Sequence, residues 1–300
     1  MGEKYVTFVV PTGYWRPGHN YVASISQAVA PRLEPSDIVV LSEKAISVAL
    51  GRIVDEAKIR PGFTARVLAR VWMRLIWGYL LAHICRLSKL TTRRLRSFPL
   101  REGAAHKQLA LSYAGFLGAL RHGSEGGIDV SNLPYSYASL PLEQPDEVAK
   151  SIVKELRKAN GVPVTVLIVD SDKTYTWRNI HICPRSTTVK GLINLGVLAY
   201  ILGRALGLRP RSTPIAMAGE PLDIEEALRA AAIANKARGS GSGATAWDMA
   251  ERFGVGLTSV TWEFLTKIEH RPIVIVRKAP RRVIANICNQ AFTSAQRLLR

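Results

Sequence analysis

Two short apolar runs rich in β-branched residues constrain the fold of this chain more than any other feature. They are Val164–Val169 (Val-Thr-Val-Leu-Ile-Val) and Asp37–Leu41 (Asp-Ile-Val-Val-Leu). Runs of this length without polar alternation are typical of strands buried on both faces. Ile273–Val276 has the same character and is expected to be the last core strand. We therefore expect an α+β protein whose mixed central sheet is flanked by helices.

Three helices are predicted between and after these strands. Residues 145–160 begin with Pro-Asp, carry an apolar stripe at spacings of four, and end before Gly161. Asp223–Ala237 is rich in alanine, and Ala244–Phe253 follows it after the glycine-serine segment 239–243, which is expected to be a flexible connection. We expect one domain over residues 1–279, with a subdivision near 180–215 and a basic tail over 280–300.

Two longer apolar runs need to be compared with membrane spans. Val71–Cys85 is short and contains Arg74, and Leu192–Leu208 contains Arg204 and several glycines. Neither reaches the roughly 18 uncharged apolar residues that a spanning helix needs. We therefore expect both to be helices buried in the protein, and no transmembrane segment.

The balance of charge is strongly basic. The chain of 300 residues has 41 Lys and Arg against 23 Asp and Glu, a formal net charge of +18. Such a surplus predicts affinity for anions, which include nucleotides, phosphorylated substrates, nucleic acids and acidic lipid surfaces. Three cysteines without a CxxC pair argue against a disulfide framework or a zinc ribbon, so a cytoplasmic setting is expected.

Much of this charge lies in residues 60–107. Arg66, Arg70 and Arg74 recur every four residues and form a basic stripe, and Thr91–Arg96 is predicted to be a basic loop. The stripe would bind phosphates or would simply be a solvated face, and the sequence favours neither. Peripheral membrane association through this region has only its charge in support.

Polar residues follow the two predicted central strands. Asp170 and Asp172 come directly after one, and Lys44 and Ser47 follow the other. Open α/β sheets place ligands at the carboxyl ends of their strands. Because two close carboxylates repel each other, a bound cation or a neighbouring basic side chain is expected beside the aspartates.

The segment Gly126-Gly127-Ile128-Asp129-Val130-Ser131-Asn132 offers a carboxylate, a hydroxyl and an amide within four positions. These are oxygen ligands that Mg²⁺ or Mn²⁺ prefers. The same residue types are common in turns. Alone, the segment favours a turn, whose glycines permit a sharp bend or a close approach to a ligand.

The order of these pieces resembles the coenzyme F420 γ-glutamyl ligase family. Its Lys-x-x-Ser and Gly-Arg motifs are matched by Lys44–Ser47 and Gly51-Arg52, and its Ala-Gly-Val-Asp-x-Ser-Asn motif by residues 126–132. Its Ser-Asp-Thr strand end and Trp-Arg pair are matched by Asp170–Asp172 and Trp177-Arg178. The resemblance extends over most of residues 8–278, always in the same order.

The resemblance implies a GTP-dependent and Mg²⁺- or Mn²⁺-dependent ligase that adds L-glutamate to coenzyme F420-0 or a related anionic acceptor, and a homodimer. Asp129 with Asp170 or Asp172 would hold the metal. The residues implied to bind nucleotide or substrate are Lys44, Ser47, Arg52, Ser131, Asn132 and Arg178.

Several family positions differ in this chain. Val48 and Leu50 replace a basic residue and a glutamate, and residues 170–176 depart from the family pattern. The alternative is therefore a paralogue with an altered substrate or no catalysis. Such a protein would bind a nucleotide-like ligand or nucleic acid through its basic surface.

Overall fold

The computed structural model describes residues 4–279, and its centre is a mixed sheet of seven strands. The strand order is β1-β9-β2-β5-β6-β7, and β8 also pairs with β5. The strands are β1 (Tyr5–Thr12), β2 (Ile38–Ser42), β5 (Thr165–Trp177), β6 (Ile180–Cys183), β7 (Leu192–Asn194), β8 (Arg209–Gly219) and β9 (His270–Lys278). The α+β class and the mixed sheet predicted from the sequence are confirmed.

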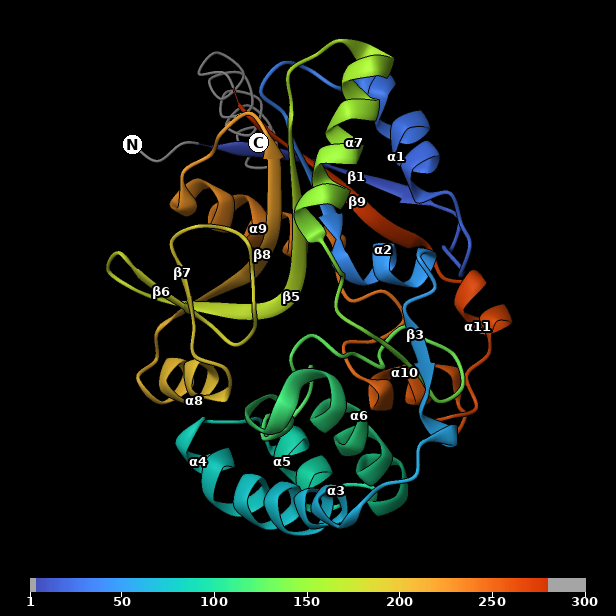
Figure 1. Cartoon of the computed structure of the whole chain (residues 1–300), viewed down its shortest axis with the longest axis vertical. Coiled ribbons are helices and arrows are strands. Elements are labelled where there is room, and N and C mark those ends of the chain that lie inside the picture. The colour runs from blue at the N-terminus through green and yellow to red at the C-terminus, as the bar shows by residue number, and fades with distance from the viewer. Residues whose placement is uncertain (1–3, 280–300) are drawn as a thin grey trace, which may run out of the picture.

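At the centre of the sheet, β2 and β5 run parallel, while β9 pairs antiparallel with β2 and β8 pairs antiparallel with β5. Side chains alternate between the two faces. One face packs Val39, Leu41 and Ile168 into a core with the helices α1 (Tyr21–Val29) and α7 (Pro145–Asn160). The other face packs Val40 and Leu167 against alanines of α9 (Ile224–Arg238). Both central strands are therefore buried on two sides, as predicted, with helices on each face (Figure 1).

Short elements connect this layer to the rest of the described chain. They are α2 (Glu43–Ala49), the 3-10 helices η1 (Ala30–Arg32) and η2 (Glu56–Lys58), the two-stranded sheet of β3 (Ile53–Asp55) and β4 (Tyr137–Ser139), and the helices α8 (Val197–Ala205), α10 (Ala246–Phe253) and α11 (Trp262–Thr266). The predicted helices at 145–160, 223–237 and 244–253 are confirmed by α7, α9 and α10. Residues 280–300, predicted as a basic tail, lie outside the described residues.

Residues 63–119 form a helical lobe below the sheet in Figure 1. It contains α3 (Phe63–Val67), the π-helix η3 (Leu68–Leu81), α4 (Ala82–Ile84), α5 (Lys89–Arg96) and α6 (Leu100–Ala119). Its core is built around Met73 and Trp77. The basic cluster at 91–96 was predicted as a loop, and this was wrong. Ser88 caps α5 by accepting a hydrogen bond from the Thr91 amide, which favours helix over loop.

The longest apolar helix of the lobe also differs from its prediction. Residues Phe63–Ile84 form one run of 22 helical residues that, by length and composition, passes the test for a membrane span; no other helix among residues 4–279 does. The expected helix is confirmed, but it begins eight residues before Val71 and only one side of it is buried. The second run was also predicted as one buried helix, but it divides into β7 and α8.

A buried ionic network joins the lobe to the segments on either side of it. The His106 ring lies 2.6 Å from the Glu56 carboxylate and 2.9 Å from that of Glu125. The Lys107 ammonium lies 2.5 Å from the other carboxylate oxygen of Glu125. Burial disfavours a charged imidazole, but the two carboxylates outweigh it and raise the pKa of His106 to about 10. The lobe is thus held by charges that are paired in the folded state.

Candidate functional site

The candidate site lies where the parallel pairing of β2 with β5 ends. Ser42 is the register partner of Val169, so Glu43 and Asp170 follow side by side where the parallel pairing of β2 with β5 ends. The strand β9 starts near this point too, because Leu41 pairs with Ile273 in the antiparallel direction. The expectation that Asp170 and Asp172 come after the strand was wrong, because β5 continues to Trp177 through its pairing with β8. Asp170 is paired with Thr213 of β8, but the next pair is Lys173 with Ser212, so Ser171 and Asp172 form a bulge. A bulge bends the strand and redirects its side chains at this point.

Arg185 connects the start of α2 with the middle of β5. Its Nη1 lies 2.5 Å from Glu43 Oε2 and 2.6 Å from Asp170 Oδ2, and its Nη2 lies 2.8 Å from Glu43 Oε1. All three side chains are buried. Burial would raise the pKa of Asp170, but Arg185, Lys44 and Arg121 lower it below its usual range. Asp170 is therefore a charged group held among cations.

Arg185 packs against the glycine pair of the 126–132 segment. Gly127 has a φ of +97°, and a Cβ at this position would lie 2.4 Å from the guanidinium carbon of Arg185. Only glycine leaves room for the guanidinium against the backbone. The close approach suggested by the sequence is thus made by a side chain of the protein itself.

Asp172 is paired with a second buried arginine. Arg121 binds both carboxylate oxygens, with Nη1–Oδ2 at 2.5 Å and Nη2–Oδ1 at 2.8 Å. The guanidinium also lies 5.2 Å from the centre of the Tyr200 ring. Because both oxygens accept from Arg121, Asp172 forms a fork-to-fork ion pair rather than an open ligand.

The motif at 129–132 folds as a turn around Lys44. The Lys44 ammonium lies 2.5 Å from Asp129 Oδ2 and donates to Ser131 Oγ at 2.8 Å. Asp129 Oδ1 accepts from the Ser131 amide at 2.7 Å, which closes the turn. The side chains of Lys44 and Asp129 remain partly exposed, at 22% and 18%. The turn therefore presents a lysine and a carboxylate to the solvent as a pair.

Asn132 ties this turn to the glycine-serine segment after α9. Its side-chain oxygen accepts from the amide and hydroxyl of Ser242, at 2.7 and 2.6 Å, and its amide nitrogen donates to Gly243 O at 3.0 Å. The Tyr14 hydroxyl donates to the Asn132 carbonyl oxygen. These contacts fix a segment that was expected to be a flexible connection.

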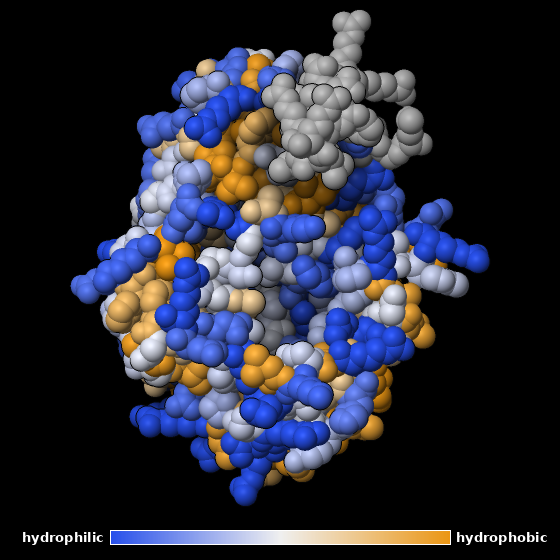
Figure 2. All heavy atoms as spheres, turned by 180° about the vertical axis from the view of Figure 1, so that it is seen from behind, coloured by the Kyte–Doolittle hydropathy of each residue, from blue (hydrophilic) through white to orange (hydrophobic). Residues whose placement is uncertain are grey.

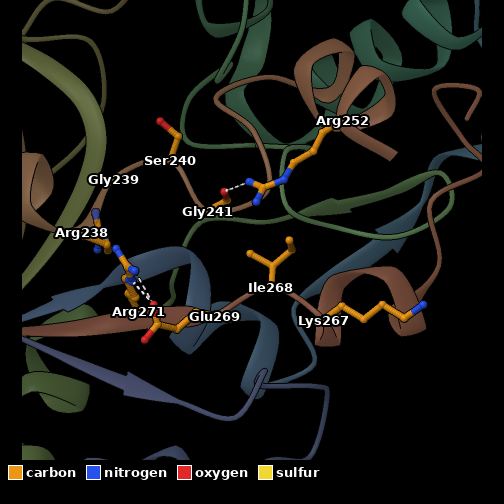
Figure 3. Close-up of a pocket in the computed structure, with 9 residues that line it drawn as sticks. All are labelled: Arg238, Gly239, Ser240, Gly241, Arg252, Lys267, Ile268, Glu269 and Arg271. Carbon is orange, nitrogen blue, oxygen red and sulfur yellow. Dashed lines mark hydrogen bonds and ion pairs between the residues drawn. The ribbon is translucent and has the colours of Figure 1, made fainter. Parts of the chain in front are cut away.

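A basic cavity of about 330 Å³ opens beside this fixed segment (Figure 3). Its wall comes from the end of α9 and the following loop, from α10, from the segment between α11 and β9, and from the start of β9. The lining residues are Arg238, Gly239, Ser240, Gly241, Arg252, Lys267, Ile268, Glu269 and Arg271. Four side chains are basic and one is acidic, and Arg271 pairs with that acid through Nε at 2.6 Å. The surplus positive charge suits an anionic ligand.

The cavity and Asp170 act on each other electrostatically. Burial lowers the pKa of Arg238 to about 10, and the nearby Asp170 carboxylate opposes this shift. Burial likewise lowers the pKa of Lys173, which Asp170 and Asp172 raise and Arg238 lowers. Arg238 is thus a shared member of the cavity wall and of the cation group around Asp170.

The predicted site residues fall into three groups in the structure. Lys44, Asp129, Ser131 and Asn132 are in contact, and Asp170 is linked to them through the charge of Lys44. Ser47 and Asp172 are buried nearby in α2 and the β5 bulge, and the Ser47 hydroxyl has no hydrogen-bond partner among residues 4–279.

The other two predicted residues make different contacts. Arg52 donates to the Pro141 carbonyl at 2.8 Å and pairs with Glu143 at 2.7 Å. Arg178 is exposed in the turn after β5, against the ring of Trp177. It lies eight residues beyond Asp170, and a strand rises by about 3.3 Å per residue. Arg178 is therefore distant from Asp170 along β5.

The three predicted metal ligands do not fit a ready-made divalent-metal centre. Asp129, Asp170 and Asp172 are each paired with a basic side chain. Within residues 4–279, no group of three or more His, Cys, Asp or Glu side chains would hold a metal ion. The metal requirement stays a prediction, and no chemical step below depends on it.

Several site residues were missed by the sequence reasoning. Glu43 could have been predicted, because it directly follows the predicted strand and stands beside Lys44. Arg121, Arg185 and Arg238 could not, because each reaches the site through a contact with residues distant in the sequence.

Together, the fold and site place paired carboxylates and arginines at one edge of a mixed sheet, next to a basic cavity. The chain matches the F420-0:gamma-glutamyl ligase family over residues 10–199. It is also 32% identical, over 283 residues, to an uncharacterized protein of Methanocaldococcus jannaschii, covering 90% of this chain and 95% of that protein. The chain belongs to the F420-0:gamma-glutamyl ligase family, and this membership supports a ligase kind of function with a small-molecule substrate.

Proposed function

We propose that this protein uses GTP to join L-glutamate to a carboxylate of coenzyme F420-0 or a related anionic acceptor. The observation that carries the proposal is the position of the Lys44–Asp129 pair. It stands partly exposed near Asp170, and Asn132 of the same turn donates to the carbonyl oxygen of Ser240, which lines the basic cavity. A site for two anionic substrates needs such a concentration of fixed positive charge.

The proposed reaction has two steps. First, the acceptor carboxylate oxygen attacks the γ-phosphorus of GTP, the bond to the β-phosphate oxygen breaks, and an acyl phosphate and GDP form. Second, the glutamate amine attacks the acyl carbon, the carbon–oxygen bond to phosphate breaks, and phosphate leaves while the nitrogen loses a proton. Both steps gather negative charge on phosphate oxygens, which nearby cations stabilise.

The described residues suggest how that charge would be met. Lys44 is the partly exposed cation of the turn, and Asp129 and Ser131 hold its ammonium in place. Arg238 and Arg252 line the cavity, where phosphate groups would bind. Arg185 is buried against Glu43 and Asp170, so it would position these two carboxylates rather than contact substrate.

Isothermal titration of GTP into the protein tests this proposal. Lys44→Ala and Arg252→Ala are expected to weaken GTP binding at least tenfold. Lys58→Ala is the matched control, because Lys58 has a side chain 85% exposed and lies in η2. Equal binding by wild type, Lys44→Ala and Arg252→Ala would reject the proposed nucleotide site.

A binding protein without turnover is the second candidate, favoured by the net charge of +18 and by carboxylates that are already neutralised. It would hold a nucleotide-like ligand or nucleic acid. Titration with RNA or DNA at two salt concentrations separates the cases, since binding through phosphates weakens steeply with salt. A homodimer and a cytoplasmic setting are further parts of the proposal, and light scattering in solution tests the first.

A further inference from the structure

The outer side of the helix Phe63–Ile84 is an apolar surface that the described chain leaves uncovered. Its inner side supplies Met73, Trp77 and other side chains to the core of the helical lobe. Its outer side exposes large apolar groups along its whole length. We call these residues the lobe face: Phe63, Val67, Val71, Leu75, Tyr79, Leu80 and Ile84. Phe63 is 82% exposed and Leu75 is 53% exposed, which is unusual for side chains of this size.

The charge of the lobe, residues 63–119, is almost entirely positive, and Glu102 is its single acidic residue. Arg66 and Arg70 are exposed on the same helix, between Phe63 and Val71. The sequence from 60 to 101 contains ten Lys and Arg residues and no Asp or Glu. At the lower end of Figure 2, hydrophobic and strongly hydrophilic side chains interleave over the lobe. An apolar surface mixed with cations is the pattern of helices that lie on anionic membranes.

A second set of exposed leucines lies beside the end of this helix. Arg204 of α8 donates to the carbonyl oxygens of Cys85 and Arg86, each at 2.9 Å, and so attaches α8 to the end of α4. Leu198, Leu202 and Leu206 of α8 or its end are exposed, and Leu206 is the most exposed of them at 69%. The apolar surface of this part of the molecule is therefore not confined to one helix.

We propose that the lobe face binds the surface of a membrane that contains anionic lipids. The apolar side chains would enter the boundary between headgroups and acyl chains, while Arg66 and Arg70 would meet lipid phosphates. The helix would lie on the membrane rather than cross it. Crossing would remove Met73 and Trp77, which are 1% and 0% exposed, from the lobe core.

Charge complementarity selects this occupant over two others. In a symmetric contact between two copies, the same patch meets itself, so its arginines would be brought together with Glu102 as the single acid of the lobe to offset them. Nucleic acid would satisfy the arginines but would leave Val71, Leu75 and their neighbours against a polar backbone. An anionic lipid surface satisfies both the charge and the apolar area.

Vesicle sedimentation with the full chain tests this proposal. Wild type is expected to sediment with phosphatidylglycerol-containing vesicles and to remain in solution with pure phosphatidylcholine vesicles. The double variant Val71→Glu, Leu75→Glu is expected to lose at least tenfold in affinity for the anionic vesicles. Both positions are exposed, so these changes leave the fold intact. Circular dichroism checks that expectation.

Two controls make the result specific. Ile180→Glu changes an exposed apolar residue of β6, away from the lobe, and is expected to bind vesicles as wild type does. Arg66→Glu, Arg70→Glu reverses the charge at these two positions and is expected to weaken binding comparably. The proposal is overturned if wild type does not bind anionic vesicles. It is also overturned if the Val71, Leu75 variant binds as wild type does, which would mean that other basic residues bind lipid through charge alone. A wild-type dimer that the same variant converts to monomer, without vesicle binding, would assign the face to a second copy.

Discussion

The guanidinium of Arg185 lies against the backbone of Gly127, at a position where a Cβ would be 2.4 Å from its central carbon. This contact joins the turn that carries Asp129 to the start of α2 and to the middle of β5, because the same arginine binds Glu43 and Asp170. The candidate site therefore depends on an internal arginine.

Replacing Arg185 by alanine is expected to destabilise the protein by about 3–5 kcal/mol, since it leaves buried carboxylates without their cation. Urea unfolding followed by circular dichroism measures the change. Arg178→Ala removes an exposed arginine of a turn and is expected to stay within about 0.5 kcal/mol of wild type. A loss for Arg185→Ala no larger than that of the control would contradict the assigned role.

Alanine at Gly127 is expected to cost more stability than alanine at Gly161. Both glycines have a positive φ, +97° and +72°, so each substitution strains the backbone by about 1–2 kcal/mol. Only at Gly127 would the new methyl group also displace the Arg185 guanidinium, whereas nothing lies within 4 Å at Gly161. Thermal unfolding of the two variants compares them directly, and equal losses would show that the arginine contact is unimportant.

Stability is expected to fall between about pH 7 and pH 10 because of His106. The folded pKa of about 10 lies above the unfolded value of about 6.5. The folded state therefore binds more protons in this window. The stabilisation is complete below pH 6.5 and is lost as the pH rises toward 10, by at most about 5 kcal/mol.

The variant His106→Gln tests the origin of this pH dependence. It is expected to be less stable than wild type at pH 7 and to show a much flatter stability curve up to pH 10. Urea midpoints at several pH values provide the measurement. An unchanged slope in the variant would assign the pH dependence to other groups.

Divalent metal is expected to bind with the nucleotide rather than to the free protein. The predicted ligands Asp129, Asp170 and Asp172 are each paired with a basic side chain, so Mn²⁺ would meet competition from those cations. Calorimetry should detect little Mn²⁺ binding alone and clear binding when GTP is present. Chelation should stop any ligase activity, and tight Mn²⁺ binding without nucleotide would contradict this expectation.

The strands and their burial were predictable because short apolar runs rich in β-branched residues occur in folded chains mainly as buried strands. The helical lobe was predicted less well. Its long helix is apolar on both sides, so the four-residue spacing of Val67, Val71, Leu75 and Tyr79 indicates a helix but not which side faces the core. These four residues lie on the exposed side.

The candidate site was predictable only in part, for a related reason. Lys44, Asp129, Ser131 and Asn132 stand in recognisable motifs, and the structure brings them together. Arg185 and Arg121 follow no motif. Their partners are determined by the parallel pairing of β2 with β5 and by the β5 bulge, and single-sequence patterns do not encode such pairings.

A ligase assay tests the central claim most directly. The protein is incubated with GTP, L-glutamate, Mn²⁺ and coenzyme F420-0, and the acceptor is followed by mass spectrometry. We predict a product heavier by one glutamyl residue with wild type and with Lys58→Ala, and a loss of at least a hundredfold in rate with Lys44→Ala. The claim would be contradicted if folded wild type made no such product, or if Lys44→Ala made it at the wild-type rate.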